Sequence, residues 1–109
     1  MKHYQQFLDS LDNDLDMVNI ILSMYKEEHS DDIEKIKSYY NNKDLDGLFH
    51  VTHSLKGVIS NFFEEEICDL LEQIETKSKT GDTPDETLIL SACEEINKLN
   101  SDINSRINA

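Results

Sequence analysis

Apolar side chains recur every three or four residues along most of the chain, the spacing that places them on one face of an α-helix. The spacing predicts a short helix around 4–10, one long or broken helix from about 13 to 41, and a helix over 45–62. Two further helices are marked by apolar residues at 67–74 and at 88–107. We therefore expect an all-α protein.

Residues that start and stop helices agree with this division. Asp44 is a good N-cap for the helix over 45–62. Gly81 can adopt the left-handed conformation that ends the helix marked by apolar residues at 67–74. The run Thr83-Pro84-Asp85-Glu86 is typical of a capping box, with Pro84 as the first helical residue. The connections between the predicted helices are therefore short.

Four long amphipathic helices with short connections bury their apolar stripes most simply as an antiparallel, up-and-down four-helix bundle. The short helix near the start is an addition to that bundle. A chain of 109 residues is close to the commonest domain size, and no linker divides it, so we expect one domain over 1–109. Because the four stripes can cover one another within one chain, we expect a monomer.

Charge and composition exclude several classes of function. The chain has 23 acidic and 10 basic residues, a net charge of −13, which disfavours nucleic-acid binding through clustered Lys and Arg. No apolar run approaches the roughly 20 residues that span a bilayer, and the first residues lack a secretory signal, so we expect a cytoplasmic protein. Cys68 and Cys93 lie within helical apolar patterns and are expected to be reduced core thiols.

The helix over 45–62 carries the candidate chemistry. At about 100° per residue, its apolar positions fall within roughly 60° of Leu48, whereas His53 lies about 140° away, on the solvent side. The residues expected around His53 on that side, with Lys56 nearer the core, are Asp46, Phe49, His50, Gly57 and Ser60. This helix therefore buries one stripe and presents a second, polar surface.

Three residues on that surface suit the handling of a phosphoryl group. A solvent-facing imidazole such as His53 is a good nucleophile near neutral pH. Lys56, one turn further along, can bring its ammonium to oxygens held on the His53 ring. Gly57 removes a side chain beside the ring, so that another protein can approach closely, although glycine inside a helix costs ~1 kcal/mol relative to alanine.

The run His53-Ser54-Leu55-Lys56-Gly57, followed by Ser60-Asn61-Phe62, resembles the signature of the histidine-containing phosphotransfer (HPt) domain family. The resemblance extends over nearly the whole chain, including Leu70-Leu71-Glu72 and the Gly81-Asp82 turn. It implies that His53 is the phosphoacceptor, that Lys56 stabilises phosphoryl charge and that Gly57 gives the partner clearance.

The same resemblance implies the partners and the division of chemistry. In the family, the phosphoryl group comes from an aspartyl phosphate on a receiver domain, of a hybrid sensor kinase or a response regulator, and leaves to another receiver aspartate. The receiver supplies Mg²⁺ and most catalytic groups, so the chain would be a phosphocarrier rather than an enzyme, with no cofactor of its own. Docking is expected on the face formed by Asp46, Phe49, His50 and Ser60 together with the three site residues.

The chain departs from the family pattern at two places. Small residues usually follow the Lys-Gly pair, but Val58 and Ile59 stand here, and Phe63 stands where a glycine usually follows the residue matching Phe62. The helix end and the following turn are therefore expected to differ from those of the family. We interpret both changes as repacking without loss of function.

Two other hypotheses remain open at the level of sequence. The chain can be an acidic helical adaptor that binds a signalling partner without phosphotransfer. Asp46, His50 and His53, spaced at i, i+4 and i+7, can also form a weak metal site, although no fourth ligand is evident. The start at Met1 and the complete set of helices favour a free-standing protein over a domain of a hybrid kinase.

Overall fold

The computed structural model describes residues 1–107, which are helical apart from short connections and contain no strand. The elements are α1 (Tyr4–Ser10), α2 (Leu15–His29), α3 (Asp32–Asn41), α4 (Leu45–Ile59), the 3-10 turn η1 (Ser60–Phe62), α5 (Glu65–Lys79) and α6 (Glu86–Ile107). Within residues 1–107, no helix is long and apolar enough to cross a membrane.

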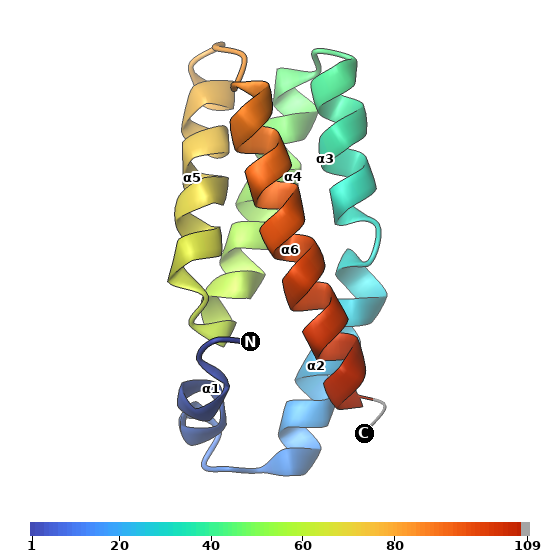
Figure 1. Ribbon diagram of the computed structural model, residues 1–109, viewed down its shortest axis with the longest axis vertical. Coiled ribbons are helices and arrows are strands. Elements are labelled where there is room, and N and C mark those ends of the chain that lie inside the picture. Colours follow the sequence, from blue (N-terminus) through green and yellow to red (C-terminus); the bar gives the residue numbers. More distant parts are fainter. Residues whose placement is uncertain (108–109) are drawn as a thin grey trace.

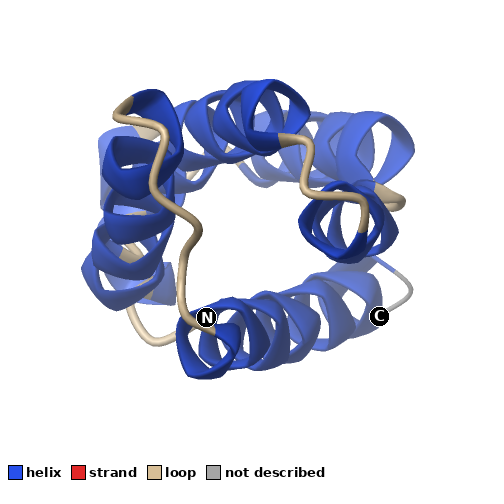
Figure 2. Ribbon diagram, turned by 90° about the horizontal axis from the view of Figure 1, so that it is seen from above, coloured by secondary structure: helices blue, strands red, loops and turns tan. Residues whose placement is uncertain are grey.

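The main helices form an antiparallel up-and-down bundle (Figure 1). Seen from above, α3, α4, α5 and α6 stand around a common centre, and α6 runs down beside α2 (Figure 2). α2 and α3 follow each other in one position of the bundle, and α1 packs at its lower end. This arrangement confirms the predicted helical bundle with a short additional helix at the start.

The long helix expected from about 13 to 41 is broken between α2 and α3. Ser30 and Asp31 lie at the break, and such side chains compete with the helical backbone for hydrogen bonds. Across the break, the His29 ring nitrogen Nδ1 lies 2.7 Å from the Asp32 carboxylate, and both side chains are largely buried. This contact joins the end of α2 to the start of α3 across the break.

The centre of the lower core is an aromatic cluster around Phe62. The Phe62 ring is fully buried and meets Phe7 and Tyr25 edge to face, with ring centroids 5.2 Å and 5.3 Å apart. Such pairs add about 0.5–1.5 kcal/mol each to the stabilisation from burial alone. Phe62 therefore joins α1, α2 and η1 below the end of α4.

The predicted helix ends are partly right. The Asp44 carboxylate accepts a hydrogen bond from the Gly47 backbone N–H at 2.9 Å, and Gly81 has a φ of +85°, so both predictions are confirmed. The capping box at 83–86 is wrong: α6 begins at Glu86, and the first helical bond runs from Ile89 N–H to the Asp85 carbonyl. Pro84 is buried in the connection, and the chain becomes helical only after it.

The departures from the family pattern lie at the end of α4 and in the turn that follows it. α4 ends at Ile59, η1 follows, and Phe63 adopts the left-handed conformation with a φ of 60°. A non-glycine residue pays about 1–2 kcal/mol for that conformation. Phe63 is half-buried against the core. Complete burial of a phenylalanine side chain stabilises a fold by about 1.5–3 kcal/mol, so partial burial offsets part of this cost. Packing thus accommodates Phe63 where glycine would be unstrained.

Both cysteines are free thiols, as predicted. Cys93 is buried in the core, and Cys68 is half-buried beside α4, where its thiol contacts the Lys56 carbonyl oxygen at 3.8 Å. Burial raises the pKa of both thiols. They are therefore protonated at neutral pH and lack the character of reactive cysteines.

Candidate functional site

α4 presents His53 to solvent because its opposite face is held in the core. Leu48, Leu55 and Ile59 are completely buried, and the Thr52 hydroxyl donates to the Leu48 carbonyl within the same face. The His53 side chain, on the other face, is 62% exposed. The predicted orientation of this helix is confirmed.

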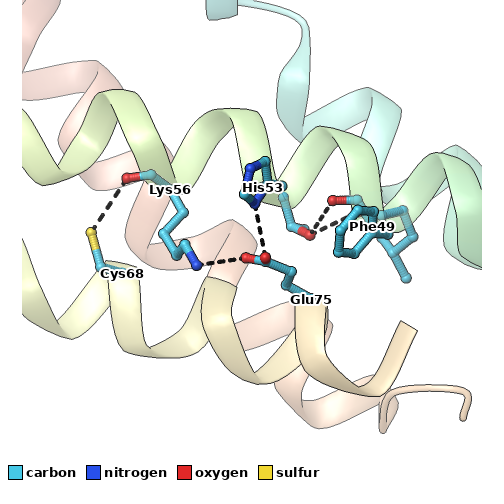
Figure 3. A network of polar contacts seen from close by, with 7 residues as sticks. Phe49, His53, Lys56, Cys68 and Glu75 are labelled. Carbon is cyan, nitrogen blue, oxygen red and sulfur yellow. Dashed lines mark hydrogen bonds and ion pairs between the residues drawn. The ribbon is translucent and has the colours of Figure 1, made fainter. Parts of the chain in front are cut away.

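A carboxylate from the neighbouring helix joins His53 to Lys56. Glu75 on α5 places one oxygen 2.8 Å from His53 Nδ1 and the other 2.8 Å from Lys56 Nζ (Figure 3). The Glu75 side chain is only 14% exposed, and that of Lys56 28%. The charges of Glu75 and Lys56 are thus partly shielded from solvent, unlike those of an ordinary surface ion pair.

The charges of this network stabilise one another. The hydrogen bond to Glu75 raises the pKa of Lys56 above its usual value. Burial alone would raise the pKa of Glu75, but the hydrogen bonds and charges of Lys56 and His53 together outweigh burial and lower it. At neutral pH the site therefore contains a carboxylate and an ammonium side by side.

The Glu75 contact determines which ring nitrogen of His53 is available. A carboxylate only accepts hydrogen bonds, so the neutral His53 ring carries its proton on Nδ1 and donates it to Glu75. The lone pair then resides on Nε2, the other ring nitrogen of an exposed side chain. The geometry therefore leaves Nε2 as the nucleophilic atom.

Phe49 and His50 lie beside His53, on the preceding turn of α4. The half-buried Phe49 ring stacks on the His53 ring with centroids 5.7 Å apart and planes inclined by 15°, and it meets His50 edge to face. His50 Nδ1 lies 2.8 Å from the Asp46 carbonyl oxygen, and both side chains are exposed. The predicted neighbours of His53 are thus together on one face.

Gly57 and Ser60 continue this face toward the end of α4. A Cβ added at Gly57 would meet no atom within 4 Å, so nothing inside the chain requires glycine there. The exposed Ser60 hydroxyl donates to the Gly57 carbonyl at 2.7 Å. The surface beside His53 and Lys56 is therefore open at Gly57.

Asp46, His50 and His53 do not come together as a metal site. Among residues 1–107, no group of three or more His, Cys, Asp and Glu side chains is placed to hold a metal ion. Instead, Nδ1 of His50 faces the Asp46 carbonyl, while Nδ1 of His53 faces Glu75.

The site thus contains an exposed imidazole nucleophile, a carboxylate behind it and an ammonium one turn away. The sequence model of the Hpt domain matches residues 20–104, which include α3 to α5 and most of α2 and α6. The chain belongs to the Hpt domain family. Searches of the curated proteins and of the solved structures gave no significant match.

Hpt domains are phosphocarrier modules of two-component phosphorelays, and they interact with receiver domains of kinases and response regulators. The family assignment confirms the resemblance that was based on the motif around His53.

Glu75 is the residue of this Hpt site that the sequence did not predict. It follows the buried Ile74 and lies on the edge of the α5 stripe formed by Ile67, Leu71 and Ile74. An acidic residue at the edge of a buried stripe is a weak signal, because such residues are common on amphipathic helices. Only the packing of α5 beside α4 gives Glu75 its role.

Replacing Glu75 with glutamine is expected to lower stability at neutral pH, on the order of 1 kcal/mol. Because folding lowers the pKa of Glu75 from its ordinary 4.5, its carboxylate stabilises the fold above that pH. The contribution is lost as the pH falls through the folded-state value. Urea unfolding of the wild type and of Glu75→Gln at pH 7 and near pH 3 measures the difference in their free energies of unfolding. The same difference at both pH values would contradict the stabilising role of the Glu75 carboxylate.

Proposed function

We propose that this Hpt domain carries a phosphoryl group on Nε2 of His53, accepting it from a receiver aspartyl phosphate and passing it to another receiver aspartate. The observation that supports the proposal is the Glu75 contact, which keeps the proton on Nδ1 of an exposed imidazole. His50 on the same face also holds Nδ1 against an acceptor, the Asp46 carbonyl, but its acidic neighbour Asp46 pairs with no lysine among the ion pairs of residues 1–107, whereas Glu75 joins His53 to Lys56.

The transfer step needs little from this chain besides the ring and its two charged neighbours. The Nε2 lone pair attacks phosphorus, the N–P bond forms as the P–O bond to aspartate breaks, and the aspartate carboxylate leaves with the electron pair. The ring becomes positive because Nδ1 keeps its proton. The Glu75 carboxylate, 2.8 Å from Nδ1, would stabilise that positive charge, as the acid partner of a catalytic imidazole does in enzymes.

Lys56 supplies the complementary charge. In the unphosphorylated protein its ammonium is paired with Glu75, on the same surface as the ring. A phosphoryl group on Nε2 brings negative oxygens to that surface, and the ammonium can then pair with them. Lys56 therefore balances charge on the phosphoryl group while Glu75 balances charge on the ring.

The receiver domain is proposed to dock over Asp46, Phe49, His50, Gly57 and Ser60. Phe49 offers the apolar contact on this face, and Gly57 leaves room for the partner close to the ring. We expect Mg²⁺ to be held by the receiver, where it would counter the charge of the transferring phosphoryl group. Because phosphohistidine and aspartyl phosphate both have high transfer potential, the exchange would be reversible.

Replacing Lys56 with glutamine is expected to slow transfer from a phosphorylated receiver domain, on the order of tenfold, because a charge-assisted contact to the phosphoryl group is lost. Lys98→Gln is the matched control, since the carboxylates that pair with Lys98 within residues 1–107 are Glu94 and Glu95 of α6. Single-turnover labelling of the wild type and both variants measures the rates. Equal rates for wild type and Lys56→Gln would contradict the role of Lys56.

A further inference from the structure

A cleft lies on the side of the bundle opposite His53. It has a volume of about 400 Å³ and is formed where α2 gives way to α3, against α6. His53 and Glu75 come from α4 and α5, whereas α3 and α6 form the opposite corner of the bundle (Figure 2). The volume falls in the range of small-molecule sites, roughly 300–1,000 Å³.

Two lysines without carboxylate partners line this cleft. Lys26 on α2 and Lys37 on α3 both border it. Within residues 1–107, no carboxylate oxygen lies within 4.0 Å of either ammonium nitrogen. Glu34 also borders the cleft and pairs with neither. In a chain with 23 acidic residues, two unpaired ammonium groups on one cleft concentrate positive charge where an anion can use it.

Three carboxamides lie along the α6 wall of the cleft, beside the apolar Ile103. Asn97, Asn100 and Asn104 lie at i, i+3 and i+7 and border the cleft together. The Tyr25 hydroxyl donates to Asn100 Oδ1 at 2.6 Å, so the Asn100 amide group keeps its N–H donors for another partner. Burial, reinforced by the charge of Asp32, raises the pKa of Tyr25, which keeps this hydroxyl protonated.

We propose that this cleft binds a small phosphate ester. Lys26 and Lys37 would pair with the phosphate, because the lysine ammonium is a compact charge suited to it. The asparagine amides would bond the polar body of the ester, against the half-buried side chain of Ile33. The proposal does not depend on His53 chemistry, because the two sites use different helices.

Titration of the full chain with ribose 5-phosphate and with AMP, followed by amide chemical shifts, tests this site. Ribose and inorganic phosphate are the probes for the two halves of the ester. The test variant is Lys26→Gln/Lys37→Gln. The control is Lys77→Gln/Lys79→Gln, which removes the same charge from the last turn of α5. Circular dichroism of both variants checks that the fold is retained.

We expect at least one ester to cause saturable shifts around the cleft, with tighter binding than ribose or phosphate alone. Affinity should fall about tenfold or more in the test variant and stay within about twofold in the control. Three results would overturn the proposal: no saturable binding of either ester, an equal loss in both variants, or phosphate binding as tightly as the esters.

Discussion

Replacing His53 with glutamine is expected to abolish phosphoryl transfer to the protein and to leave its fold intact. The glutamine amide nitrogen has no available lone pair, so it cannot replace Nε2 as a nucleophile. The ring is 62% exposed and makes one ion-pair contact, to Glu75, so its loss changes the free energy of unfolding by less than about 1 kcal/mol.

The measurement is labelling by a phosphorylated receiver domain, combined with urea unfolding. His3→Gln is the matched control, because His3 is an exposed imidazole that lies outside the proposed docking face. It should be labelled like the wild type. Full labelling of His53→Gln would place the acceptor elsewhere, whereas unfolding of that variant would contradict the solvent-facing position of His53.

Replacing Gly57 with glutamine should weaken transfer strongly without destabilising the protein. A Cβ at this position meets no atom of the chain within 4 Å, and glutamine is a much better helix former than glycine. A docked receiver would, however, have to accommodate the new side chain. Overpacking of this kind costs about 1–3 kcal/mol, on the order of tenfold to a hundredfold in transfer at low partner concentration.

The graded control is Gly57→Ala, which adds only a methyl group. It should raise the free energy of unfolding by about 0.5–1 kcal/mol, because alanine pays less backbone entropy than glycine in a helix. Its transfer should be impaired less than that of Gly57→Gln. Normal transfer by Gly57→Gln would show that the receiver does not approach over this residue.

The orientation of α4 could be predicted from sequence because it depends on one helix alone. The rotation of 100° per residue relates His53 to the buried Leu48 and Leu55 whatever the other helices do. The same geometry gathers Phe49 and Gly57 beside His53. The pattern of a single amphipathic helix, capped by Asp44, was therefore enough to predict which residues lie beside His53.

Glu75 could not be predicted in the same way, because its role depends on how two helices pack. Which edge of α5 faces α4, and at what height, is determined by side-chain packing along both helices. The periodicity of α5 identifies Ile74 as buried but does not say that the next residue reaches His53 and Lys56.

Helix ends were predicted less well than helix faces, because several residues compete to begin or end a helix. Asp44 and Gly81 behave as their chemistry suggests. At the start of α6, Asp85 takes the capping position instead of Thr83, while Pro84 remains in the connection. Between α2 and α3 the apolar period gave no sign of the break, which depends on local polar side chains.

The most direct test of the central claim is whether a phosphorylated receiver domain transfers its phosphoryl group to His53 of the wild-type chain. The chain would be incubated with several active phosphorylated receivers and then mapped by phosphorus NMR and mass spectrometry. We expect an acid-labile, base-stable phosphohistidine at His53, bonded through Nε2, which a second receiver can remove. Absence of label from every active donor would contradict phosphotransfer and favour an adaptor that binds its partner without this chemistry.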